Sequence, residues 1–394
     1  MSRLHFVGSS VLGAAGSAMV PISALLLFST VDYGAFSVPY LIFALGWSMT
    51  LSAVCDTWAR GRSEGTGRRE WDSYSGALLT GAAAAALVTV AVTGFVLGNW
   101  MNAVAAGAGV GANIYRLGAR FFHSASKGPQ AVLASDTAGV AVFVLAVAAT
   151  LVMHLPPLAG VLTGWALASL ASALLFPLPR PGRGTGLVSW VRQRRARIVP
   201  LLGESLLMDA GSIGAPLAMA PFLGTANFGA YRSISSVAMP IQLTLDPIRP
   251  NISQMPPSVL LSRKVLAVVL GVAALMSAAC FAVLGLVLPH LHFVAGALAT
   301  LAHYAVACTV YVAVGFLGHF YYIVSRGILA HGSLVRGRAI QTAMHILFPF
   351  TGLFLTGLDG AIWGFVAANA AAALVWPAFL LRQHGAVVGA AGRA

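Results

Sequence analysis

The segment Ala15-Gly16-Ser17-x3-Pro21-x8-Thr30-x3-Gly34-Ala35 occurs twice in this chain. Its second copy reads Ala210-Gly211-Ser212-x3-Pro216-x8-Thr225-x3-Gly229-Ala230. The two copies are 195 residues apart without a gap, close to half of the 394 residues. Chance matches among the abundant Ala, Gly and Ser residues are the alternative, but the matched Pro, Thr and aromatic positions argue against it. The repeat predicts two halves of similar structure.

Composition places both halves in a membrane. Charged residues make up 8% of the chain and hydrophobic residues 58%, with a mean hydropathy of +0.86. A soluble domain carries about a quarter charged residues, and disordered chains are poor in apolar ones. These numbers predict an all-α, polytopic integral membrane protein. The net charge of +13 would suggest nucleic acid in a soluble chain, but here we expect no nucleic-acid partner.

Windows of about 20 apolar residues, the length that crosses the hydrocarbon core, predict twelve spans. They lie near residues 6–28, 34–55, 75–97, 101–118, 130–153, 157–177, 199–221, 226–247, 265–288, 300–325, 338–356 and 361–381. Loops after even-numbered spans, together with the termini, hold 22 of the 23 Lys and Arg residues. The positive-inside rule makes that side cytoplasmic, with both termini inside. Arg232 is the exception.

The spans divide into an N-terminal six-helix bundle (1–177), a basic cytoplasmic linker (178–198) and a C-terminal six-helix bundle (199–394). Six spans per half give both halves the same orientation in the membrane. We therefore expect the two bundles to be related by an axis along the membrane normal, with a substrate path between them.

The phrase Phe222-Leu-Gly-Thr-Ala-Asn-Phe-Gly-Ala-Tyr231 and the prolines after it (Pro240, Pro247, Pro250) resemble the polysaccharide-exporter branch of the MOP flippase superfamily. This branch includes the Wzx-type O-antigen flippases, and its relatives are the MurJ-type lipid II flippases and the MATE antiporters. The first half repeats the phrase as Tyr33-Gly34-Ala35-Phe36. The chain is short for the family, and its fourth span is unusually rich in Gly and Ala.

The resemblance implies two six-helix bundles in a V around a central cavity, alternating access, and a polyprenyl-diphosphate-linked glycan as cargo. It also implies a multi-pass protein of the bacterial cytoplasmic membrane, in contact with membrane lipids and coupled to H⁺ or Na⁺. We expect a monomer without a cofactor. The chain has no P-loop, HExxH or GxSxG motif, so we expect no enzyme.

Charged residues at membrane depth are functional candidates, because each costs about 2.5–3.5 kcal/mol to insert. Arg232 lies about one and a half turns into the eighth span and can hold a phosphate through its planar fork. The alternative interpretation is an interfacial arginine that reaches the headgroups or pairs with Asp32. Both residues are candidates for the substrate path.

Two carboxylates lie in the seventh span, Glu204 and Asp209. They are five residues apart and differ by about 140° around the helix, so one should face the cavity more than the other. A buried carboxylate can carry a proton or accept a cation. Glu204 is close to the cytoplasmic boundary, and contact with water or a linker arginine is the alternative.

Arg116 and Arg120 lie four residues apart at the inner end of the fourth span. They can meet a diphosphate at the cytoplasmic entrance, or else attach the helix to anionic lipids. Asp136 is interpreted as a surface partner of Arg120 or Lys127. Neither the three Cys residues nor the His-x-His pair at 290 and 292 has the partners of a metal site, so we expect none.

Two rival functions remain open. An ion-coupled small-molecule antiporter of the MATE or major-facilitator type would need Glu204 or Asp209 in the cavity. A membrane glycosyltransferase or ligase would bring long outer loops with catalytic residues, and the longest outer loop here has only about eleven residues.

Overall fold

The computed structural model describes residues 12, 16, 18–60, 67–128, 130–180, 186–238, 241, 244, 245, 252, 255, 257–291 and 296–391. All regular elements in these ranges are helices, with no strand. Some residues of the sequence motifs lie outside the described ranges, namely Ala15, Ser17, Pro240, Pro247 and Pro250.

Eight helices within the described ranges are long and apolar enough to cross a membrane. One of them, residues 187–236, contains the seventh expected span and the first part of the eighth, and Gly224 within it has a left-handed backbone (φ 70°) at the expected break. The first expected span is only partly described, and the apolar helix α7 has 17 residues. The multi-pass character is confirmed, whereas the count of twelve and the sides of the termini stay predictions.

The chain divides into two compact units. The first comprises the described residues of 1–28 and 35–209, and the second those of 29–34 and 210–394. The first unit holds most of α2 (Thr30–Thr50), a π-helical segment (Leu51–Asp56), α3 (Thr57–Arg60), α4 (Arg68–Leu97), α5 (Trp100–Lys127), α6 (Gln130–Val152), α7 (Pro157–Ala173) and α8 (Leu187–Asp209).

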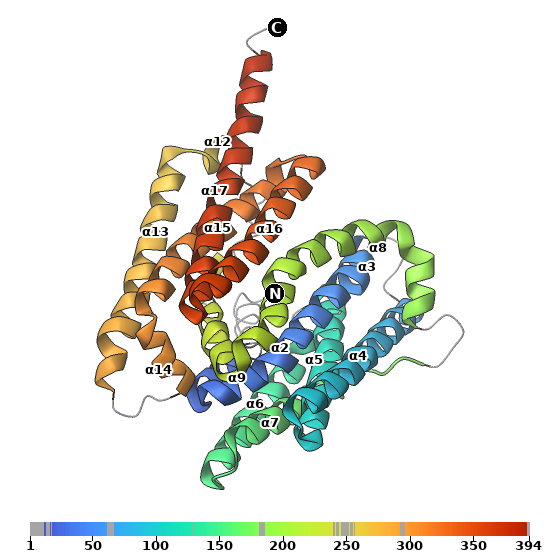
Figure 1. Ribbon diagram of the computed structural model, residues 1–394. Helices are drawn as coiled ribbons and strands as arrows, with labels where there is room; N and C mark the ends of the chain where they lie inside the picture. The colour runs from blue at the N-terminus through green and yellow to red at the C-terminus, as the bar shows by residue number, and fades with distance from the viewer. Residues whose placement is uncertain are drawn as a thin grey trace. The chain divides into compact units, whose positions relative to one another are not determined.

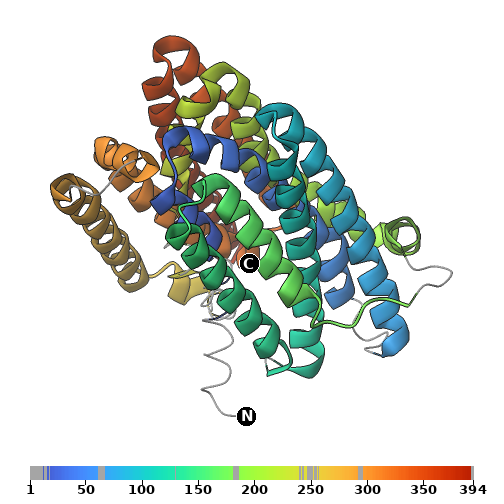
Figure 2. The same ribbon diagram turned by 90° about the horizontal axis from the view of Figure 1, so that it is seen from below.

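Within the first unit, α5 packs against α4 and α7, and α6 packs against α7 (Figures 1 and 2). The glycines of α5 explain its unusual composition. A Cβ on Gly107 would lie 2.8 Å from the carbonyl oxygen of Ala86, and one on Gly111 would lie 3.1 Å from that of Ala82. Small residues let two helix backbones approach closely inside a membrane. The fourth expected span is therefore rich in Gly and Ala because it packs closely against α4.

The outward faces of the helices are apolar. On α4, Leu87 is 71% exposed and Phe95 90%, and on α13 (Arg263–Phe281) Leu275 is 69% exposed. Large apolar side chains on a continuous outer surface would be unfavourable in water. Their placement fits helices whose outer faces contact lipid.

The second unit is a helical bundle in which α17 packs against α15 and α16, and α13 packs against α15 (Figure 1). Where α16 crosses α17, a Cβ added to Gly352 would contact the carbonyl oxygen of Gly360. A Cβ added to Gly360 would in turn contact the carbonyl oxygen of Gly352. The helical segments of this unit are Ala210–Gly214 (π-helical), α9 (Ala215–Ser236), α12 (Pro257–Leu260), α13, Ala282–Val287 (π-helical), Leu288–His290, α14 (Gly296–His303), α15 (Ala305–Ile328), α16 (His331–Thr356) and α17 (Leu358–Ala391).

The two copies of the repeated Thr-x3-Gly motif contact each other, and both contacts lie in the second unit. A Cβ on Gly34 would lie 2.0 Å from the carbonyl oxygen of Thr225, and one on Gly229 would lie 1.9 Å from that of Thr30. The contact is reciprocal, because each glycine faces the carbonyl oxygen of the threonine in the other motif. Only glycine fits at these two positions, because the neighbouring atoms belong to backbone.

Candidate functional site

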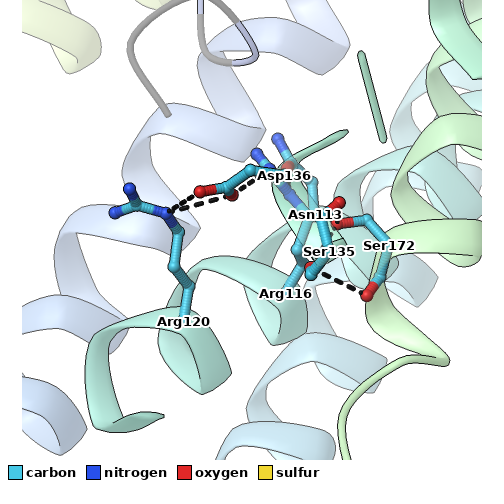
Figure 3. A network of polar contacts seen from close by, with 6 residues as sticks. All are labelled: Asn113, Arg116, Arg120, Ser135, Asp136 and Ser172. Carbon is cyan, nitrogen blue, oxygen red and sulfur yellow. Dashed lines mark hydrogen bonds and ion pairs between the residues drawn. The ribbon is translucent and has the colours of Figure 1, made fainter. Parts of the chain in front are cut away.

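Two clusters of polar side chains, one in each unit, contain arginines that the sequence analysis selected. The first cluster consists of Asn113, Arg116, Arg120 and Asp136, on α5 and α6 (Figure 3). Arg120 donates from Nε to both carboxylate oxygens of Asp136, at 3.1 and 2.9 Å. Arg116 donates from Nε to Oδ1 of Asn113 at 3.0 Å, and its Nη1 lies 3.7 Å from Oδ1 of Asp136.

Helix geometry brings this cluster together. Residues 113, 116 and 120 follow one another at spacings of three and four, which places them on one face of α5. Asp136 lies in the second turn of α6, across a short connection from the end of α5. Next to it, Ser135 and Ser172 exchange hydrogen bonds that tie α6 to α7 (Figure 3).

The first cluster carries more positive than negative charge. Arg116 and Asp136 are 5% and 1% exposed, and Arg120 is half-buried. Both guanidinium groups therefore lie near one buried carboxylate, and the side chain of Arg120 remains partly exposed.

This geometry corrects two interpretations of the sequence. The pairing of Asp136 with Arg120 is confirmed, but Asp136 is buried and is not a surface residue. Arg116 is also buried, so the interpretation that it attaches the helix to lipid headgroups is wrong. The residue spacing predicted that Arg116 and Arg120 share one face of α5. It did not predict that Arg116 and Asp136 are buried, because their burial depends on the packing of α5 against α6 and α7.

The second cluster consists of Tyr33, Arg232, Ser236 and Tyr311, all in the second unit. The hydroxyls of Tyr33 and Ser236 are hydrogen-bonded at 2.5 Å. Arg232 lies within electrostatic range of the hydroxyls of Tyr33 and Tyr311. Its Nε is buried, and no hydrogen-bond partner for it is found within the described part of the chain. The cluster therefore contains a guanidinium group whose Nε–H has no acceptor among the described residues, and phenolic hydroxyls lie within range of its charge.

Asp32 has a local structural role. Its backbone N–H donates to Oγ of Ser29 at 3.0 Å, and the Ser29 hydroxyl donates back to its carboxylate at 2.7 Å. This reciprocal pair caps the first turn of α2. Among the described residues there is no ion pair between Asp32 and Arg232, so the interpretation that they pair is wrong in this conformation.

The two carboxylates of α8 differ in environment. Asp209 is 2% exposed and accepts a hydrogen bond from Ser205 at 3.4 Å, and Ser205 is itself bonded to Ser48 at 2.7 Å. Glu204 is half-buried. All four residues lie in the first unit. Of the six candidate residues, Arg116 and Arg120 lie together in the first cluster, and Glu204 and Asp209 lie on α8. Asp32 and Arg232 belong to the second unit, with no ion pair between them among the described residues.

Sequence reasoning missed Asn113, Tyr33 and Tyr311 as members of these clusters. Asn113 had a usable signal, because it lies three residues before Arg116 on the same helix face. Tyr311 had none, since its position within electrostatic range of Arg232 depends on tertiary packing. No group of three or more His, Cys, Asp and Glu residues suited to a metal ion is present among the residues that the structure describes.

Comparison with known proteins gives matches only at the level of structure. No family model and no curated protein sequence matches the chain. Among solved structures, an inward-facing multidrug resistance MATE transporter of the MOP superfamily is similar with a TM-score of 0.61 at 14% identity, over 99% of this chain and 96% of that one. The lipid II flippase MurJ is similar with a TM-score of 0.66 at 12% identity, over 98% and 88%.

A variant of the MATE transporter VcmN from Vibrio cholerae is similar with a TM-score of 0.59 at 12% identity, over 96% of this chain and 94% of that one. The chain shares the fold of these solved structures. These neighbours are transporters and a flippase, not enzymes. Identities this low show the fold alone, so they do not distinguish the polysaccharide-exporter branch from its relatives.

Proposed function

We propose that the protein is a flippase that moves a lipid-linked oligosaccharide, or another polyprenyl-diphosphate-linked polysaccharide precursor, across the bacterial cytoplasmic membrane by alternating access. The observation that carries the proposal is Nε of Arg232, which is buried and has no hydrogen-bond partner among the described residues. A buried polar group without a partner calls for an explanation, and an absent ligand is one. The fold shared with the lipid II flippase MurJ supports the same class of cargo.

The chemistry of the second cluster suits a diphosphate. The guanidinium of Arg232 offers planar, paired donors that match phosphate oxygens. The hydroxyls of Tyr33 and Tyr311 lie within the range of its charge and can donate to the same anion. An arginine away from bulk water binds an anion more strongly than an exposed one, because the local dielectric constant is lower. The polyprenyl tail would meanwhile remain in lipid.

Replacing Arg232 by Ala should lower the amount of surface glycan at least tenfold in cells that depend on this protein. One lost charge-assisted contact of about 1.5–3 kcal/mol corresponds to this factor or more. Arg192→Ala is the matched control, because Arg192 is exposed on α8 and belongs to neither cluster. Surface glycan is measured by lectin binding, and membrane content by immunoblot. Normal glycan at normal protein level in the Arg232 variant would refute the role of this residue.

An ion-coupled antiporter is the second candidate, and the buried carboxylate of Asp209 favours it. Carboxylates shielded from water can exchange protons or cations in transport, and the MATE neighbours share the fold. In that case Asp209→Asn should abolish proton-coupled efflux of organic cations from loaded vesicles. Efflux that is absent in the unsubstituted protein would eliminate this candidate.

A further inference from the structure

An apolar groove lies on the surface of the first unit, where α4, α5 and α7 meet. Its volume is about 260 Å³. Small residues of α4 and α5 form its floor, among them the buried Ala82, Gly107 and Gly111. Exposed leucines form its rim, among them Leu79 on α4 and Leu174 at the end of α7. The groove is therefore open along the outside of the unit.

The lining of the groove suits a hydrocarbon chain. Among the described residues that line it, Tyr115 alone has a polar group, and this hydroxyl donates to the carbonyl oxygen of Pro177 at 3.2 Å. The groove thus offers no free polar group to an occupant. An empty groove would leave its lining atoms without contacts on one side. The apolar outer faces of the helices point to lipid as the source of the chain.

The groove has the length of a chain in one leaflet. Its lining residues on α5 run from Gly107 to Tyr115, which is about 12 Å along the helix axis. Half of the hydrocarbon core of a bilayer is about 15 Å thick. One acyl chain that extends from a headgroup towards the middle of the bilayer matches this length.

Exposed arginines lie at the Tyr115 end of the groove. Nη2 of Arg68 donates at 3.4 Å to the carbonyl oxygen of Leu178, which lines the groove, and Tyr115 lies within electrostatic range of Arg68. The backbone N–H of Arg180 donates to Oδ1 of Asp72 at 3.2 Å, and the same oxygen lies 3.3 Å from Nε of Arg68. Two exposed arginines thus lie beside one carboxylate, which favours an anionic headgroup over a zwitterionic one.

We propose that the first unit binds one anionic phospholipid at this groove, with an acyl chain in the groove and the phosphate beside Arg68 and Arg180. Guanidinium groups bind phosphate oxygens through paired donors, and the chain fills the apolar space between the three helices. The site belongs to the first unit and concerns a resident lipid, so it does not depend on the proposed flippase activity or on Arg232.

The test is thermal unfolding of the purified full-length protein in detergent, titrated with dioleoyl phosphatidylglycerol or dioleoyl phosphatidylcholine. We expect a saturable rise in the unfolding temperature, with half-saturation at a lower concentration of phosphatidylglycerol. A ligand that binds the folded state alone stabilises it in this concentration-dependent way. Equal responses to the two lipids would overturn the proposal. Tighter binding of polyprenyl phosphate than of phosphatidylglycerol would assign the groove to a carrier lipid and would also overturn it.

Two neighbouring alanines on α4 provide a matched pair of variants for the chain. Ala83 lines the groove and Ala84 does not, and both are exposed. Ala83→Phe should raise the phosphatidylglycerol concentration for half-saturation at least tenfold, because the ring takes the space of the chain and its methylenes lose their burial. Ala84→Phe should leave this concentration unchanged. Equal binding by the two variants would show that the chain lies elsewhere.

The headgroup is tested with a second pair of variants. Arg180→Gln should raise the half-saturating concentration of phosphatidylglycerol about fivefold, the effect of one arginine near a membrane surface, and should leave that of phosphatidylcholine unchanged. Arg192→Gln, an exposed position on α8 that does not line the groove, should change neither value. A full preference for phosphatidylglycerol in both Arg180→Gln and Arg68→Gln would overturn the placement of the headgroup.

Discussion

Replacing Gly229 by alanine is expected to destabilise the protein by about 3 kcal/mol or more, at the upper end of overpacking effects. The added Cβ would lie 1.9 Å from the carbonyl oxygen of Thr30, and a carbonyl in a helical turn cannot move aside like a flexible side chain. Gly34→Ala should behave alike, since its Cβ would lie 2.0 Å from the carbonyl oxygen of Thr225. The unfolding temperature in detergent, followed by size-exclusion chromatography after heating, measures the effect.

Gly271→Ala on α13 is the matched control. It is also a helical glycine, but no atom lies within 4 Å of its added Cβ. Alanine there should be neutral or stabilise by up to about 1 kcal/mol, because it favours the helix. If Gly229→Ala and Gly271→Ala proved equally stable, the reciprocal contact of the two repeat motifs would be wrong.

The second large effect is expected for Asp136→Asn. The substitution preserves volume but removes the single carboxylate that Arg116 and Arg120 share. Removing one partner of a buried ion pair costs about 3–5 kcal/mol, because the remaining charges stay buried without compensation. The loss is measured as a lower unfolding temperature of the purified protein in detergent.

Asp72→Asn serves as the control for this change. Asp72 pairs with Arg68 at 3.3 Å, but Arg68 is 44% exposed. An exposed pair of this kind contributes about 0–1 kcal/mol. Similar losses for Asp72→Asn and Asp136→Asn would contradict the burial of the first cluster.

The composition predicted the membrane class and the all-helical architecture, because the apolar pattern extends over the whole chain. The glycine repeat also predicted which residues correspond in the two halves. It did not predict that Gly34 and Gly229 face each other, since correspondence in sequence does not require contact. That contact follows from the way the start of α2 crosses α9 within the second unit.

The candidate charges were predicted less well than the fold. Spacing correctly placed Arg116 and Arg120 on one face of α5 and paired Arg120 with Asp136. Their depth could not be deduced, because charged residues near a helix end look alike in sequence whether they face lipid headgroups or a neighbouring helix. The hydrogen bonds between Ser135 and Ser172 could not be deduced either, because the two serines are more than thirty residues apart in sequence.

The proposed flippase activity is tested most directly with the purified protein in liposomes that carry a polyprenyl-diphosphate-linked glycan. Exposure of the glycan to an external lectin or glycosidase is followed over time. We predict that the unsubstituted protein accelerates its appearance in the outer leaflet and that Arg232→Ala slows this step at least tenfold, whereas Arg192→Ala does not. Transfer no faster than in protein-free liposomes, or equal rates for the Arg232→Ala and unsubstituted proteins, would contradict the proposal.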